Sequence, residues 1–250
     1  TSGAPAPGTL FKPDTEDSVD ARMGWLGARA YGEARQESGH RFGYRADLAY
    51  LHGREMRTAF TEREDGLLSA GNSSAQSVRG HAWDLGAQWV LPGSARPTFS
   101  VGLAGGSGGA DGATIDRNFR QTGLQENKGR TGGVKRFRYY GELLDPELSN
   151  LRIGTVGFGL RFLSNSSVEL LLHQYRQQVA STRLAGSRLS EDPMGISKDI
   201  GREVDFLVAM RQSRNLELTL KLMSFRPGAA FAADRRDSAH GIEVGGTLAY

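Results

Sequence analysis

Charged side chains in this sequence recur at every second position within segments whose alternate residues are apolar. Arg45 and Asp47, for example, alternate with Ala46 and Leu48. A guanidinium group binds a carboxylate through two parallel hydrogen bonds, whereas a lysine ammonium acts as a point charge. Several moderate sites of this kind suit a polymer that carries many carboxylates, because one tight site would trap it. The basic candidates on this face are Arg29, Arg45, Arg161, Arg211 and Lys221.

Acidic residues occupy the same face and allow a second interpretation of the basic set. They are Asp47, Asp84, Glu203, Asp205 and Glu217, with Glu243 near the end of the chain. They could pair with the arginines and only stabilise the structure, or they could act as spacers that keep a polyanion from sticking. For any single arginine both interpretations stay open.

A second basic group lies in a long connection and could form an external or in-folded basic patch. Its members are Arg120, Lys128, Arg130, Lys135, Arg136 and Arg138. The net charge of the whole chain is +3, which by itself is only weak support for an anionic partner.

Catalytic and metal-binding patterns are poor. Residues 105–109 match G-x-S-x-G around Ser107, but a nucleophile elbow needs a strand, a sharp turn and then a helix, and a flexible loop follows here. The five histidines lack metal-ligand spacing, and there is no cysteine. We therefore expect no metal, no cofactor and no enzyme activity; an enzyme that uses Ser107 or His173 remains a third alternative.

Alternation of period two dominates the chain and predicts β-strands. The segment 41–52 runs about twice the ~5–6 residues of an ordinary strand and matches the ~9–11 residues that cross a bilayer at a tilt. Eight further segments alternate in the same way: 21–35, 78–90, 98–106, 152–162, 168–178, 203–211, 216–225 and 239–250. No apolar run approaches the ~20 residues of a membrane-spanning helix, so the pattern predicts an antiparallel transmembrane β-barrel.

The predicted connections alternate between short and long. The short ones are 36–40, 91–97, 163–167 and 212–215, and the long ones are 55–76, 107–150, 180–200 and 227–238. Short periplasmic turns and long external loops are typical of outer-membrane barrels. Segment 134–143 is therefore assigned to one external loop, 107–150, because a membrane crossing there would mix long loops and tight turns on one side.

This assignment leaves about nine strands in residues 21–250, with residues 1–20 as an external loop segment. Single-chain bacterial barrels have even strand numbers, so we expect a preceding part of the protein to supply the rest of the barrel. The aromatic residue at the end of the chain, Tyr250, is typical of a last barrel strand.

Aromatic side chains fall on both predicted faces. Those expected to face outward, as interface girdles, are Tyr44, Tyr50, Trp83, Trp89, Phe162 and Tyr250. Those expected in the lumen, where they could stack on sugars, are Tyr31, Tyr139, Tyr140 and Tyr175.

An ordered set of motifs resembles the alginate export porin family of pseudomonads. The motifs are residues 119–127 (FRQTGLQEN), 147–151 (ELSNL), 198–205 (KDIGREVD) and 225–228 (FRPG). The resemblance extends from about Gly24 to Tyr250 and matches the C-terminal half of the family's proteins. It implies a barrel of about eighteen strands, of which nine would be half.

The resemblance also implies a function: export of a polyuronate through a basic lumen in the outer membrane of a Gram-negative bacterium. The implied partners are an acidic polysaccharide, outer-membrane lipid and periplasmic export-complex proteins, with no nucleic acid. Thr219 and Lys221 fall where the family places inward basic residues. The family's long plugging turn is reduced here to residues 212–215, so we expect no plug on that side and specify only an anionic, alginate-like polysaccharide. The alternatives are a surface or soluble β-sheet module that binds acidic glycans, and a general anion-selective porin.

Overall fold

The computed structural model describes residues 6–11, 19–110, 113–122, 127–130, 132–211 and 215–248. The start of the predicted external segment, motif residues 123–126, most of the turn 212–215 and Tyr250 therefore lie outside the described residues. The long strands are β2 (Val19–Arg35), β3 (Arg41–Glu62), β4 (Leu68–Val90), β5 (Thr98–Gly106), β9 (Leu151–Phe162), β10 (Ser166–Gln177), β11 (Asp199–Met210), β12 (Leu216–Pro227) and β13 (Ala239–Leu248). The short elements are β1 (Leu10–Phe11), β6 (Ile115–Asp116), β7 (Lys128–Gly129), β8 (Phe137–Arg138) and the 3-10 helix η1 (Ala233–Arg235).

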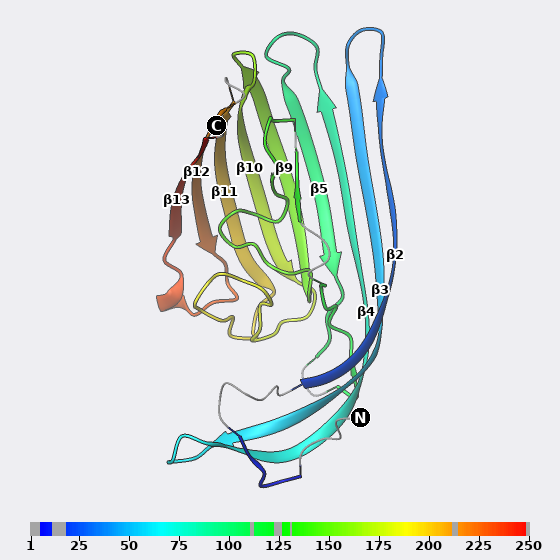
Figure 1. Cartoon of the computed structure of the whole chain (residues 1–250), viewed down its shortest axis with the longest axis vertical. Helices are drawn as coiled ribbons and strands as arrows, with labels where there is room; N and C mark the ends of the chain where they lie inside the picture. The colour runs from blue at the N-terminus through cyan, green and yellow to red at the C-terminus, as the bar shows by residue number, and fades with distance from the viewer. Residues whose placement is uncertain are drawn as a thin grey trace.

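The nine long strands form one curved antiparallel sheet, here called the wall. Each strand pairs with the next long strand along the chain, in the order β2-β3-β4-β5-β9-β10-β11-β12-β13. Figure 1 shows the wall with β2 and β13 as its two edges and its loops gathered on the concave side. The all-β fold and the predicted set of nine strands are confirmed.

The convex face of the wall is apolar and exposed. Val101 and Leu103 on β5 are 56% and 57% exposed, while their neighbour Ala104 on the opposite face is buried. A row of aromatic rings crosses four strands of this face near the tight turns. Its ring centroids are 5.7 Å apart for Phe42 and Trp89, 6.2 Å for Trp89 and Phe99, and 5.2 Å for Phe99 and Phe158. A continuous apolar surface that spans several strands on the outside of a sheet marks a contact with lipid or protein.

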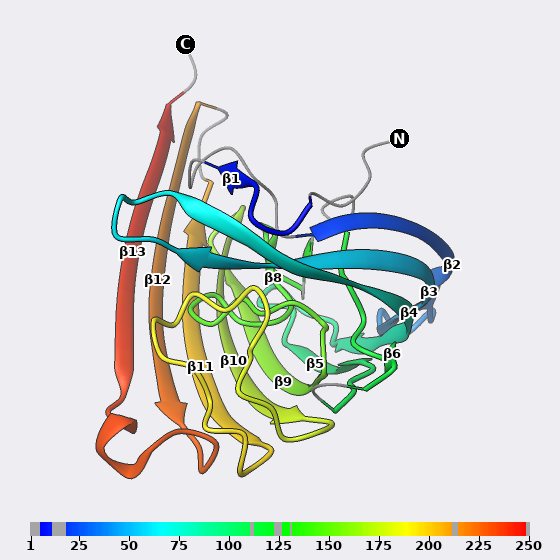
Figure 2. The same ribbon diagram turned by 90° about the horizontal axis from the view of Figure 1, so that it is seen from below.

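Tight turns and long connections lie at opposite ends of the wall, as predicted, with one correction. Residues 55–76 are not a loop, because β3 and β4 continue as a paired hairpin that turns at residues 63–67. Cross-strand contacts such as Thr58 Oγ1 to Ser73 Oγ, 2.9 Å apart, stabilise this extension. Its polar residues lack a clear alternation because the hairpin leaves the wall and bends beneath the concave side (Figures 1 and 2).

The connection 107–150 packs against the concave face. Within it, the segment 134–143 contains only the two-residue strand β8, which pairs with β7, so it does not cross the wall. Leu144 and Leu148 of this connection pack in one buried cluster with Leu51, Tyr175 and Phe225 of the wall. The hydrophobic core therefore lies between the in-folded loop and the sheet.

Helices contribute almost nothing to this fold. Among the described residues, no helix is both long enough and apolar enough to cross a membrane.

Candidate functional site

Two buried carboxylates of β11 hold the in-folded loop against the concave face. Glu203 accepts hydrogen bonds from the backbone N–H of Leu143, at 2.7 Å, and of Leu144, at 3.0 Å. Asp205 accepts one from the N–H of Glu142, at 3.0 Å. These three hydrogen bonds satisfy backbone donors that would otherwise be buried without partners.

The contacts of Glu203 and Asp205 with the loop are here called the anchor. The turn that precedes them in the loop depends on glycine. Gly141 has a φ of +98°, a conformation that L side chains rarely adopt. A Cβ at this position would also overlap the Tyr175 hydroxyl and crowd the carboxylate of Glu203. Glycine thus allows the loop backbone to approach the wall closely enough to donate to Glu203.

Buried polar side chains of β10 complete the anchor. The Tyr175 hydroxyl lies 3.0 Å from Glu203 Oε2 and 2.9 Å from the carbonyl oxygen of Tyr140. His173 Nδ1 lies 2.9 Å from Thr155 Oγ1, and its Nε2 lies 3.4 Å from Asp205 Oδ2. His173, Tyr175 and Tyr140 are buried, so Tyr140 and Tyr175 cannot serve as exposed stacking platforms.

Lys221 of β12 joins the same loop to the last strand. Its Nζ lies 2.8 Å from Glu142 Oε2 and 3.0 Å from Glu243 Oε1. Thr219, at the other position that the resemblance singled out, is buried and donates to the carbonyl oxygen of Gly245 at 3.4 Å. Glu142 is a residue of this contact that the sequence did not reveal, because nothing in an irregular loop indicates which acid meets a strand.

Arg45 and Arg29 lie on the concave face of β3 and β2, each beside a carboxylate. Arg45 lies 3.3 Å from Asp84, and its guanidinium stacks over the Tyr139 ring at 3.8 Å. Asp84 also accepts from the Tyr140 hydroxyl at 2.9 Å. Arg29 uses its Nε for Asp47, but 53% of its side chain is exposed. A guanidinium carries five N–H donors, so Arg29 keeps donors for a ligand.

The remaining predicted lumen residues lie nearer the tight turns. Arg161 donates to the carbonyl oxygens of Gly132 and Gly133, at 3.0 and 3.2 Å. Arg211 lies 3.9 Å from Glu217, which also pairs with Lys135 at 2.6 Å. Lys135 thus fixes the loop to the wall at a second place.

The basic residues of the loop contact different partners, and Lys128 lies opposite Arg138 where β7 pairs with β8. Arg120 pairs with Glu55, at 3.1 Å, and with Asp116, whereas Arg138 pairs with Asp145 at 3.1 Å. Arg136 donates to the carbonyl oxygen of Lys128 at 2.8 Å. Lys128 and Arg130 are exposed.

Two loop carboxyls differ in their electrostatic setting. Burial raises the pKa of Asp116, but hydrogen bonds from the Asn118 N–H and from Arg120 outweigh it, so its pKa lies below the ordinary value. Burial raises the pKa of Asp145 despite the nearby Arg138. The Asp116 contacts therefore stabilise the loop at neutral pH and weaken as the pH falls through the lowered pKa of that group.

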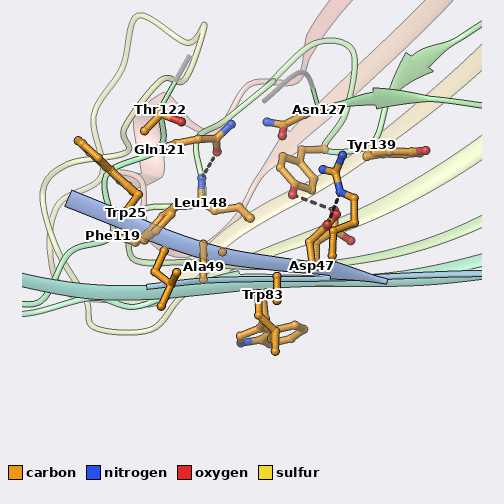
Figure 3. Close-up of a pocket in the computed structure, with 18 residues that line it drawn as sticks. Trp25, Asp47, Ala49, Trp83, Phe119, Gln121, Thr122, Asn127, Tyr139 and Leu148 are labelled. Atoms are coloured by element: carbon orange, nitrogen blue, oxygen red, sulfur yellow. Dashed lines mark hydrogen bonds and ion pairs between the residues drawn. The ribbon is translucent and has the colours of Figure 1, made fainter. Parts of the chain in front are cut away.

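An open pocket of about 400 Å³ lies between the loop and strands β2 to β4. Figure 3 shows Trp25, Phe119, Gln121 and Leu148 on the loop side of the sheet, with Trp83 on the other side. The Trp25 indole donates to the carbonyl oxygen of Arg120 at 2.9 Å. Sequence reasoning missed Trp25, although it stands two alternations before Arg29 and so shares its face.

The Ser107 hydroxyl makes hydrogen bonds with the backbone on both sides. Its hydroxyl donates to the carbonyl oxygen of Arg117, at 2.7 Å, and accepts from the His81 N–H, at 2.9 Å. These contacts tie the start of the loop to β4. The described residues after it contain no helix before β9, so the geometry of a nucleophile elbow is missing.

Comparisons with known proteins agree with this architecture. A family described as "Alginate export" matches residues 9–244. The chain is 29% identical over 208 residues to the "Alginate production protein AlgE" of Pseudomonas aeruginosa, which covers 80% of this chain and 41% of that protein. It is 24% identical over 210 residues to the protein of the same name from Pseudomonas syringae pv. tomato, with 78% and 40% covered.

A third relative, the "Alginate production protein AlgE" of Azotobacter vinelandii, is 29% identical over 137 residues, or 51% of this chain and 28% of that protein. The chain spans about two fifths of the length of the first two relatives. The family match covers nearly all of the wall and its in-folded loop. The chain therefore belongs to the alginate export family.

Proposed function

We propose that this chain forms about half of the wall of an outer-membrane channel through which a Gram-negative bacterium exports an anionic, alginate-like polysaccharide. The concave face is the lumen and the convex face contacts lipid. A preceding part of the protein completes a barrel of about eighteen strands. The channel has no catalytic role, and it works with periplasmic proteins that deliver the polymer.

The observation that carries this proposal is the reversed placement of apolar and charged side chains. Leu103, Val156 and Leu172 on the convex face are exposed, whereas Glu203 and Asp205 on the concave face are buried under the loop. A soluble glycan-binding module would bury its apolar face and expose its charges. An outer-membrane wall requires the arrangement observed here.

Within the lumen we assign contact with the polymer chiefly to Arg29. Arg45 and Lys221 are half-buried in ion pairs and stacking contacts, and they position the loop. Arg29 borders the open pocket that contains Trp25 and keeps half of its side chain exposed. A guanidinium and an aromatic ring that line one pocket offer a donor group for a carboxylate and an apolar face for a sugar ring.

Electrical recording from the full-length protein in a planar bilayer of neutral lipid tests the proposal. We expect anion-selective conductance that a polyuronate blocks from the lumen. Replacing Arg29 by glutamine should weaken block about two- to fivefold, the loss expected for one exposed charge contact of ~0.5–1 kcal/mol. Arg235→Gln, at an exposed arginine of the loop after β12, is the matched control and should leave block unchanged.

Three results would contradict the proposal. A neutral polymer of equal length that blocks as well as the polyuronate would indicate a general porin. Equal block of the Arg29→Gln and wild-type channels would remove Arg29 from the polymer path. Full-length protein that stays monomeric without detergent would exclude the membrane wall itself.

A further inference from the structure

Exposed arginines also lie on the convex face, at the end of the wall that carries the long loops. On strands β9 to β12 they are Arg152, Arg176, Arg202 and Arg226, here called the arginine row. All four side chains share the face of the exposed apolar residues, because each stands an even number of positions from Val156, Leu172, Val204 or Leu222 on its own strand. The row therefore points away from the lumen.

The register places these arginines directly opposite one another. Arg152 on β9 opposes Arg176 on β10, and Arg202 on β11 opposes Arg226 on β12. A third opposed pair on the convex face, Arg22 and Arg54, joins β2 to β3. Like charges at directly opposite positions of an antiparallel pair destabilise the sheet unless an anion lies between them.

No carboxylate of the described residues forms a salt bridge with any member of the row. Arg152 and Arg202 donate to neutral amides, those of Gln178 at 3.3 Å and Gln174 at 2.7 Å. Asp199 opposes Arg176 in register, but it accepts a hydrogen bond from Gln174 at 3.2 Å. The row thus has no internal counter-ion.

An opposed arginine pair on the concave face shows the contrast. Arg35 and Arg41 face each other across β2 and β3, and Glu33 lies 2.6 Å from the first and 3.9 Å from the second. Among the described residues, a carboxylate therefore pairs with the inward arginines and none pairs with the outward ones. An anion from the surroundings of the wall would neutralise the outward pairs.

The row also lies at one border of the apolar surface. On β11 the next convex-face residues after Arg202 are Val204 and Phe206, and the strand ends in Met210 without another charge on this face. On the described strands β9 to β12 the convex face is thus apolar along most of each strand, and its arginines lie at the long-loop end. A headgroup layer of negative charge at that end complements this distribution.

We propose that the arginine row binds the phosphate monoester groups of anionic lipid headgroups, as in lipid A, in the leaflet on the long-loop side of the membrane. Guanidinium groups bind phosphate through paired hydrogen bonds, and a phosphate between two opposed arginines removes their repulsion. The inference rests on the proposed membrane wall. It adds a lipid site on the outer surface, separate from the lumen.

The test compares the full-length protein in nanodiscs of phosphatidylcholine with nanodiscs that also contain a bisphosphorylated lipid A. The variants are Arg152→Gln with Arg176→Gln, and Arg202→Gln with Arg226→Gln. The control is Arg63→Gln with Arg235→Gln, two exposed arginines that already pair with Asp65 and Glu191. The readouts are the lipid A that remains bound after mild detergent exchange and the unfolding temperature.

The expected result is that the difference in unfolding temperature between the row variants and the wild type changes sign between the two lipids. In phosphatidylcholine each row variant should unfold at the same temperature as the wild type or higher, because the repulsion is gone. In lipid A nanodiscs the wild type should gain unfolding temperature and the row variants should not. Retained lipid A should fall at least about fivefold for each arginine removed, and the control should match the wild type.

Other outcomes would overturn the inference. Equal lipid A retention by the wild type and the row variants would exclude the row as the site. An equal rise in unfolding temperature on adding inorganic phosphate to phosphatidylcholine nanodiscs would indicate binding of a free anion only. Conductance in neutral lipid is measured in parallel, so a failed channel is distinguishable from a failed lipid site.

Discussion

Replacing Glu203 by alanine is expected to release the in-folded loop from the wall. The change removes the acceptor for the Leu143 and Leu144 N–H groups and the partner of the Tyr175 hydroxyl, all of them in the buried anchor. The two loop N–H groups would be left buried without an acceptor at a cost of ~1–3 kcal/mol each, so the loop should lose roughly 2–6 kcal/mol of local stability. Single-channel conductance of the full-length protein should rise, and protease should cut within 134–150.

Glu33→Ala is the matched control for this variant. Glu33 also lies on the concave face, but its contacts are with the side chains of Arg35 and Arg41 at the tight-turn end. Its removal should leave loop proteolysis unchanged. Glu203→Gln should give an intermediate result, because an amide oxygen can accept one N–H while its NH₂ group faces the other. Wild-type conductance and proteolysis in Glu203→Ala would show that the anchor does not restrict the lumen.

The second large effect is expected from Gly106→Ala at the end of β5. A Cβ there would overlap the carbonyl oxygen of Leu148, which belongs to the backbone of the returning loop. That backbone has little room to shift, since the Leu148 N–H donates to Gln121 and the Asn150 N–H donates to the carbonyl oxygen of Ser107. The variant should lose at least about 2 kcal/mol of stability, measured as a lower unfolding temperature in detergent.

Gly154→Ala provides the comparison for Gly106. A Cβ at Gly154 would meet only the Leu103 side chain, at 3.8 Å, which is an ordinary van der Waals distance. This control should unfold within about 0.5 kcal/mol of the wild type. Similar stability of the two variants would mean that the loop does not pack against Gly106 in the membrane.

The strands of the wall could be predicted from the sequence because one physical rule governs them all. Each strand of the wall has an apolar face and a charged face, so its apolar and polar residues alternate with a period of two. This alternation is visible in the sequence wherever a strand belongs to the wall. Thr98–Gly106 has the predicted limits, and the other strands differ from prediction by a few residues, apart from β3 and β4. The continuation of those two strands was missed because a hairpin that leaves the wall has no lipid-facing side.

The partners of the charged residues could not be predicted in the same way. Alternation places Lys221 and Arg45 on the concave face, but it does not say that Lys221 meets Glu142, 79 residues earlier, or that Arg45 stacks on Tyr139. Both contacts depend on how an irregular loop folds back. Loop conformation follows from tertiary packing and hydrogen bonding and leaves no periodic trace in the sequence.

By itself, the sequence determined the class of fold, the number of long strands and the face on which each charged residue lies, because side-chain direction in a strand is a local property. Only the tertiary structure decided which inward arginines are neutralised and which outward arginines have no carboxylate. Register between strands and the path of the loop set these distances, and both arise from contacts between residues far apart in the chain. Arg29 and the arginine row, indistinguishable by residue type from Arg45, acquire their expected roles from those contacts.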